Sequence, residues 1–150
     1  MSHEGYALDV GWLIGHDDAD VITLHRVLSA IEAMRSRGSN VLLDFDGHIE
    51  GEYARHLQPG MLGRKIYAHV HKAQMLLHVS GKLTQKSADA LDKACFDPSD
   101  RPYLGAASSG CGAYVTHEEK HLRDEQSAAI QSACGVPVLG TEEFFEDLGV

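Results

Sequence analysis

Four carboxylates from separate segments of the chain are the residues best suited to do chemistry: Asp9, Glu52, Asp100 and Glu118. Carboxylates that converge repel one another unless a hard cation neutralises them, and Mg²⁺ and Mn²⁺ prefer oxygen ligands. A cation held in this way can activate water and hold a phosphate group for in-line attack. The four acids are therefore candidate metal ligands and candidate catalytic residues at one Mg²⁺ or Mn²⁺ site.

For these acids to meet, the chain must bring their segments to one edge of a sheet. Short apolar stretches predict strands over 6–10, 41–43, 113–115 and 136–139. Asp9 lies at the end of the first stretch, and Glu118 lies two residues past Thr116, after the third. Ligands of such sheets bind outside the carboxyl ends of the strands, so this edge is where a site is expected.

Apolar residues at helical spacing alternate with these strands. They predict helices over 24–37, 49–57, 62–79, 87–94, 103–107, 116–133 and 142–148. Glu52 lies on the second helix, and Asp100 lies in a polar loop that leads into the fifth. Strands that alternate with helices predict an α/β fold with a mostly parallel sheet. We expect a single domain over 1–150, with four to five short strands flanked by helices.

The order of these segments resembles that of the PIN-domain ribonucleases over about residues 7–148. The matching segments are ALDVGWL around Asp9, IEGEYARHL around Glu52, DPSDRPYLGAA around Asp100, YVTHEEKHL around Glu118 and the closing VPVLGTEEFFEDL. The resemblance implies a PIN-like fold and a Mg²⁺- or Mn²⁺-dependent endoribonuclease. It also implies that the four acids hold the metal and that Thr116 supports the site by hydrogen bonding.

The resemblance carries expectations about partners as well. It implies an RNA substrate, a possible homodimer and, because the family includes toxins, a possible antitoxin-like protein. Three positions depart from the family pattern. Gly11 stands where Asn or Ser is frequent, Glu118 where Asp is usual, and Lys120 where many members have an acid. These departures leave open a non-catalytic interaction module on the same fold.

Each acid also has a structural alternative. Asp100 could cap the helix that follows it, and Glu52 could pair with His56 one turn later. Thr116 and Glu119 have the spacing of a capping box, which would use Glu119 and leave Glu118 free.

The segment Asp44-Phe45-Asp46-Gly47 resembles the first motif of haloacid-dehalogenase-type phosphatases. In those enzymes the first Asp attacks phosphorus and the second serves as acid and base. His48 stands where that family has Thr or Ser, and the motif follows a complete strand–helix unit. We therefore favour a turn between strand and helix, for which Asp and Gly are suited, and keep the phosphatase as an alternative.

Basic residues near the acids could bind the phosphates of RNA. The candidates are Arg55, Arg64, Lys65, Lys72 and Arg101. The alternative for Lys65 and Lys72 is a solvated helix face.

The composition argues against several classes of protein. With 22 Asp and Glu against 13 Lys and Arg, the net charge of −9 argues against a general nucleic-acid coat. The chain has no apolar run near the ~20 residues of a membrane helix, and its first residues lack the pattern of a signal peptide. Three well-separated cysteines fit a reducing compartment. We expect a cytoplasmic protein that does not bind membranes.

Overall fold

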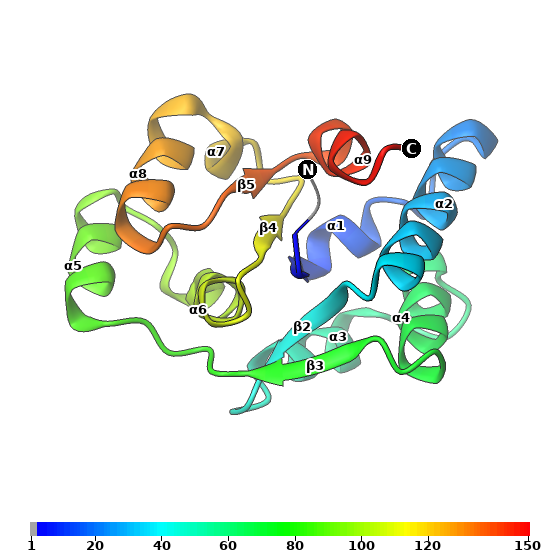
Figure 1. The fold of residues 1–150 in the computed structure, drawn as a ribbon, viewed down its shortest axis with the longest axis horizontal. Helices are drawn as coiled ribbons and strands as arrows, with labels where there is room; N and C mark the ends of the chain where they lie inside the picture. Colours follow the sequence, from blue (N-terminus) through cyan, green and yellow to red (C-terminus); the bar gives the residue numbers. More distant parts are fainter. Residues whose placement is uncertain (1–2) are drawn as a thin grey trace.

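The computed structural model describes residues 3–150 and confirms the predicted α/β fold (Figure 1). Its parallel strands form one sheet in the order β3-β2-β1-β4-β5. The strands are β1 (Gly5–Leu8), β2 (Asn40–Asp44), β3 (Leu76–Val79), β4 (Ala113–Val115) and β5 (Val138–Leu139). The chain order reverses between β1 and β4. Such a switch point opens a crevice at the carboxyl ends of the two strands.

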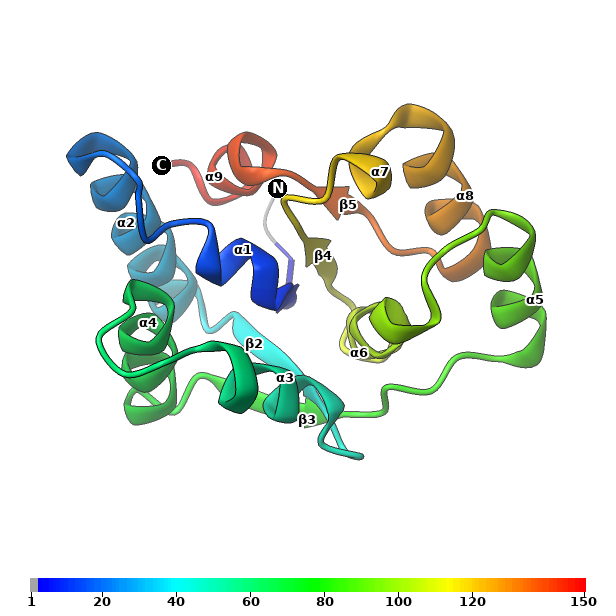
Figure 2. The same ribbon diagram turned by 180° about the vertical axis from the view of Figure 1, so that it is seen from behind.

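Helices flank this sheet, with α3 beside β2 and with α7 and α8 beside β5 (Figure 2). They are α1 (Val10–Ile14), α2 (Val21–Arg37), α3 (His48–His56), α4 (Leu62–Lys72), α5 (Gln85–Lys93), α6 (Arg101–Ser109), α7 (Glu119–Leu122), α8 (Asp124–Cys134) and α9 (Thr141–Leu148). A short 3₁₀ turn, η1 (Pro98–Asp100), precedes α6. Within residues 3–150, no helix is long and apolar enough to cross a membrane.

The central strands show why helices must cover both sides of the sheet. Tyr6, Ala7 and Leu8 are all buried, although successive residues of a strand point to opposite faces. Ala113, Tyr114 and Val115 repeat this pattern in β4. Burial on both faces removes the apolar side chains from water, the main favourable term in folding. It also fixes the strand ends, and with them the residues that follow each strand.

The predicted helix over 62–79 is wrong in its second half. α4 ends at Lys72, the chain turns at Gln74 with a φ of 58°, and Leu76–Val79 forms β3. β3 pairs with β2, Leu76 lying opposite Val41. The apolar spacing of α4 continues by coincidence into a strand, and the unpaired edge of β2 decides the conformation.

Two further predictions need correction. The first strand ends at Leu8 rather than at residue 10, because Asp9 caps α1, a short helix from Val10 that the apolar pattern did not predict. The helix predicted over 116–133 is two helices, since Arg123 between α7 and α8 is extended, with a ψ of 138°. The other predicted elements are confirmed, with bounds that shift by a few residues.

Candidate functional site

Asp9 lies at the switch point, directly after the central strand, and only 5% of it is exposed. One oxygen, Oδ1, accepts a hydrogen bond from the Gly11 N–H (3.3 Å). The other, Oδ2, accepts from the Thr116 hydroxyl at 2.9 Å. The Thr116 oxygen in turn accepts from the Glu118 N–H at 3.0 Å. Thr116 therefore ties the ends of β1 and β4 together and holds the Asp9 carboxylate in place.

The electrostatics of Asp9 bring two more predicted acids to the same place. Burial raises the pKa of Asp9 above its usual range, and the negative charges of Asp100 and Glu118 raise it further. The hydrogen bonds from Thr116 and Gly11 oppose this rise. Such repulsion requires that the carboxylates lie near one another. Asp100, of η1, and Glu118, in the turn after β4, therefore lie close enough to Asp9 for their charges to act on it, and the Glu118 backbone is joined to Asp9 through Thr116.

Glu52 lies on α3 and binds basic neighbours on the same helix. Its carboxylate contacts Arg55 and His56 at 3.2 Å each and His48 at 3.7 Å. The predicted pair with His56 is confirmed. Glu52 is not remote from the other acids, because its charge, with those of Asp9 and Asp100, helps burial to raise the pKa of Tyr103.

Tyr103 was not among the predicted site residues, yet it lies among three of the acids. Its ring is buried in α6, and its hydroxyl accepts a hydrogen bond from the Val10 N–H at 3.3 Å. Tyr103 thus joins the start of α6 to the start of α1, next to Asp9. Its distance of three residues from Asp100 was the available signal, since such spacing places both at one end of a helix.

Asp100 does not cap α6, because its side chain makes no hydrogen bond to the backbone of the first turn. Its Oδ2 instead lies 3.1 Å from Nε2 of His121, a fully buried residue of α7. The other ring nitrogen, Nδ1, lies 2.7 Å from the Gln126 side-chain oxygen. The Gln126 amide nitrogen donates to the Ala94 carbonyl, so this oxygen must accept from the His121 N–H.

His121 is therefore a buried ring with an acceptor at each nitrogen. Burial works against its protonation, but the hydrogen bonds with Asp100 and Gln126 outweigh burial and raise its pKa. The fully buried ring thus holds the Asp100 carboxylate through Nε2. No residue spacing in the sequence pointed to it.

The capping box predicted for Thr116 and Glu119 is not formed. α7 begins after Glu118, and the Thr116 oxygen accepts from the Glu118 N–H rather than from the Glu119 N–H. The reason is that Thr116 already serves Asp9, which places its hydroxyl toward β1. Glu119 is an exposed residue in the first turn of α7.

The Asp44–Gly47 segment is a turn that starts α3. Asp44 is 2% exposed, and its oxygens accept from the Ile49 N–H (2.8 Å) and the His48 N–H (3.1 Å). Both oxygens therefore satisfy the free N–H groups of a helix N-terminus. This arrangement supports the turn interpretation over the phosphatase motif.

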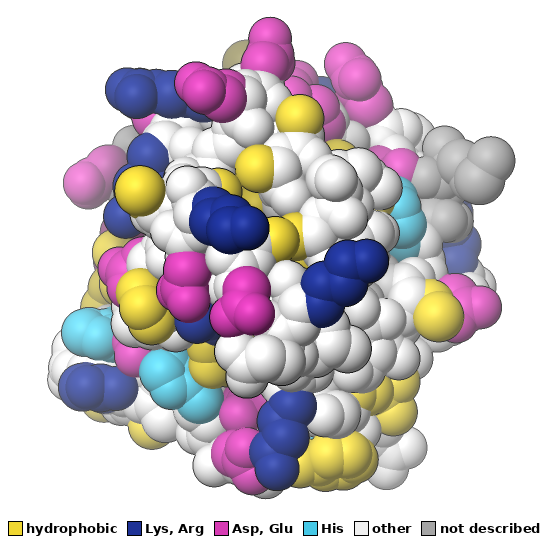
Figure 3. Space-filling model, turned by 90° about the vertical axis from the view of Figure 1, so that its left-hand side faces the viewer, with side chains coloured by type: hydrophobic (Ala, Val, Ile, Leu, Met, Phe, Trp, Pro, Cys, Tyr) yellow, Lys and Arg dark blue, Asp and Glu magenta, His cyan; other side chains and the backbone are white. Residues whose placement is uncertain are grey.

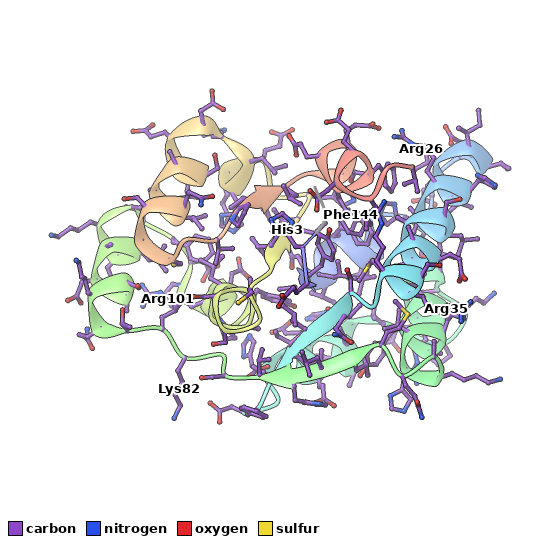
Figure 4. The ribbon with its side chains drawn as sticks, in the orientation of Figure 1. His3, Arg26, Arg35, Lys82, Arg101 and Phe144 are labelled. Atoms are coloured by element: carbon purple, nitrogen blue, oxygen red, sulfur yellow. The ribbon has the colours of Figure 1, made fainter. Side chains whose placement is uncertain are left out.

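The predicted RNA contacts lie on three helices, and three of them have partners within the chain. Arg55 binds Glu52, Arg64 donates to the Leu57 carbonyl at 2.9 Å, and Arg101 extends from α6 toward Asp92 of α5 (Figure 4). Lys65 lines a small hollow between α2 and α4, and Lys72 ends α4. These residues do not lie around the switch point as a single set.

The acids near Asp9 suit a metal ion in their chemistry but not in their present arrangement. Among residues 3–150, no group of three or more His, Cys, Asp or Glu side chains is arranged to hold a metal ion. The chemistry of the donors fits nevertheless, because hard cations bind carboxylate oxygens and would relieve the repulsion that raises the pKa of Asp9. Asp9, Asp100 and Glu118 are the residues that would hold such an ion.

No protein-family model, curated protein or solved structure matches this chain. The fold and the site therefore define its class: a parallel α/β domain with acidic residues gathered at the switch point of its sheet.

The neighbours Glu118 and Glu119 offer a matched pair of variants. We expect Glu118→Gln to lower any metal-dependent activity by about tenfold or more, because its charge acts on Asp9. Glu119→Gln removes the same charge one residue away and should leave activity within about twofold of the wild type. Initial rates of RNA cleavage measure both. Loss of activity in Glu119→Gln alone would contradict this placement of the site.

A second histidine near the site predicts a pH-dependent stability. His16 is 2% exposed, packs edge-on against Trp12 with ring centres 4.4 Å apart, and has no hydrogen-bond partner at Nε2 within the described chain. Burial, with a smaller effect of His117, lowers its pKa from 6.5 to about 4. The unfolded chain therefore takes up a proton near pH 6.5 that the folded chain refuses, so stability falls as the pH drops below that value.

Between about pH 7 and pH 5, we expect the wild type to lose about 2 kcal/mol more stability than His16→Phe, which cannot be protonated. Urea unfolding at the two pH values measures the difference. His25→Gln, at an exposed position of α2, is the control and should follow the wild type. Equal pH dependence in wild type and His16→Phe would mean that His16 is not held neutral.

Proposed function

We propose that this chain is a Mg²⁺- or Mn²⁺-dependent endoribonuclease of the PIN type, which hydrolyses phosphodiester bonds at Asp9, Asp100 and Glu118. The observation that carries the proposal is the position of Asp9 at the switch point of a parallel sheet, where Thr116 joins its carboxylate to the Glu118 backbone and where the charges of Asp100 and Glu118 act on it. Glu52, one helix away, is the fourth acid of the resemblance. Asp9 is a buried carboxylate repelled by neighbouring acids, an arrangement that costs stability in the absence of a cation, and this supports a role in binding one.

The residues around the acids have distinct roles in this proposal. Asp9, Asp100 and Glu118 would hold the cation, which when bound supplies an activated water and neutralises charge on the phosphate. Thr116 holds Asp9 through its hydroxyl, and His121 holds Asp100 through Nε2. Tyr103, buried in α6, accepts a hydrogen bond from the Val10 N–H and so holds the backbone next to Asp9.

The finer parts of the proposal rest on the resemblance. It implies RNA rather than DNA as substrate, action in the cytoplasm, and a possible homodimer. A toxin neutralised by an antitoxin-like protein is the biological role that it suggests.

A second candidate is a non-catalytic interaction module on the same fold. It is favoured by the present partners of the carboxylates, since Asp9 binds Thr116 and Gly11, Asp100 binds His121, and Glu52 binds basic residues of its own helix. Acids committed to such contacts could serve only to position the surrounding helices.

Cleavage of labelled RNA by purified protein separates the two candidates. We expect cleavage with Mn²⁺ and with Mg²⁺, and none with EDTA. Cleavage that survives EDTA would exclude the metal-dependent mechanism. If the folded protein does not cut with either ion, the interaction module is the better account. Hydrolysis of a small aryl phosphate that is lost in Asp44→Asn would instead favour the phosphatase.

A further inference from the structure

A cavity of about 610 Å³ lies between α5 on one side and α7 and α8 on the other. Its lining includes Lys93 at the end of α5, Lys120 of α7, Arg123 between α7 and α8, and Gln126 of α8. The face over α5 and α8 carries Lys and Arg side chains that stand apart from one another (Figure 3). The cavity is thus open to solvent and bordered by three cations: Lys93, Lys120 and Arg123.

These three cations differ from most arginines of the chain. Arg26, Arg35, Arg55 and Arg101 each bind a carboxylate. The side chains of Lys93, Lys120 and Arg123 are exposed and, within residues 3–150, make no ion pair or hydrogen bond. Glu125 is the one acid in the lining. In a protein of net charge −9, this cavity therefore keeps a local excess of positive charge.

The cavity borders the acidic site. Gln126 lines it and also accepts the hydrogen bond from His121, whose other nitrogen faces Asp100. Lys120 lies two residues after Glu118 in the chain, and its positive charge reaches both His121 and Asp97. A ligand seated in the cavity would thus lie beside α7, on the far side of His121 from Asp100.

We propose that this cavity binds the phosphate groups of a nucleic-acid strand whose neighbouring nucleotides reach the acidic site. Lys and Arg side chains bind backbone phosphates without regard to base sequence, and three unpaired cations at separate positions suit the repeating phosphates of a strand. The direction of the strand toward Asp100 rests on the proposed function. Phosphate binding in the cavity does not, because it follows from the cations alone.

A strand of nucleic acid suits the cavity better than an acidic peptide. A peptide would bring carboxylates toward Asp100 and Glu118, which already repel Asp9. A phosphodiester is negatively charged too, but it is the group on which the cation of the proposed function would act, so this preference for a nucleic-acid strand rests on that function.

Binding is measured by fluorescence anisotropy of a short single-stranded RNA in EDTA, so that cleavage cannot occur. The test variant is Lys120→Ala/Arg123→Ala. The control is Lys82→Ala/Lys86→Ala, which removes the same charge from exposed positions outside the cavity. We expect the test variant to raise Kd roughly tenfold and to flatten the slope of log K against log salt by about 0.7 per lost contact. The control should keep the wild-type slope.

Several results would overturn the proposal: RNA binding equal in the test variant and the wild type, no RNA binding by the wild type, or equally tight binding of poly-glutamate. A loss of RNA binding in Lys65→Ala/Lys72→Ala alone would mean that the phosphate contacts lie on α4 rather than in the cavity. Thermal melts verify that each variant is folded. A separate cleavage assay with Mn²⁺ distinguishes the two proposals. RNA binding that depends on the cavity, without RNA cleavage, would contradict only the proposed function. RNA cleavage, with RNA binding that does not change in the cavity variant, would contradict only the proposal for the cavity.

Discussion

Asp9→Asn is expected to abolish most RNA cleavage and to raise the melting temperature of the metal-free protein. The activity should fall by about 100-fold or more, because the variant removes a charge that would bind the cation directly. Stability should rise because Asp9 is almost fully buried and is repelled by Asp100 and Glu118. An amide keeps the shape and can donate to the Thr116 oxygen while it accepts from the Gly11 N–H.

Thermal melts and cleavage rates test the two halves of this prediction together, with a gain of roughly 3 °C for each kcal/mol. Asp46→Asn is the matched control, because it makes the same change at an exposed turn. It should alter neither quantity. Normal RNA cleavage by Asp9→Asn would mean that Asp9 does not belong to the site. A lower melting temperature of this variant would mean that the charge of Asp9 stabilises the fold.

Gly105→Ala is expected to cause the largest loss of stability. Gly105 lies on α6, where an added Cβ would stand 1.9 Å from the Gly81 carbonyl oxygen and 2.3 Å from its carbon. Both are backbone atoms, so α6 and the segment after β3 would have to move apart. We expect a loss of about 3 kcal/mol, at the upper end of overpacking. Because α6 begins beside Asp100, cleavage should fall as well.

Gly51→Ala serves as the control, because Gly51 lies on the exposed side of α3 with no atom near an added Cβ. Alanine favours the helix over glycine, so this variant should gain about 0.5–1 kcal/mol. Urea unfolding compares both with the wild type. Wild-type stability in Gly105→Ala would show that α6 and Gly81 are not in close contact.

The sequence was sufficient for the parts of the fold that local patterns determine. Val41–Leu43 and Ala113–Val115 are short and wholly apolar, as buried parallel strands must be, and both were predicted. β3 was missed because Leu76, Leu77 and Val79 also satisfy the helical spacing of α4. Only the free edge of β2 makes the strand preferable, and that edge exists only in the folded sheet.

The residues of the candidate site were likewise predicted where local patterns place them and missed where packing does. Asp9 and Glu118 were predicted to lie close together because each follows a strand, and the contacts through Thr116 confirm that the topology of the parallel sheet brings these two positions together. His121 was missed because its partner Asp100 lies 21 residues earlier, at a distance that no helix or turn imposes. Lys93 and Lys120 likewise meet at one cavity only because α5 and α7 both pack against α8. Contacts that arise only from tertiary packing impose no regular spacing of residues in the sequence, so the sequence cannot reveal them.

We propose that Asp9, Asp100 and Glu118 act as one site for a divalent cation. Broadening of backbone amide NMR signals by Mn²⁺ tests it most directly, because the paramagnetic ion broadens only the signals near it and no RNA is needed. We predict that substoichiometric Mn²⁺ first broadens Gly11, Arg101 and Glu118, and that Asp9→Asn abolishes the effect. First broadening at another acidic segment, such as Glu142–Glu143, or an unchanged pattern in Asp9→Asn, would contradict the claim.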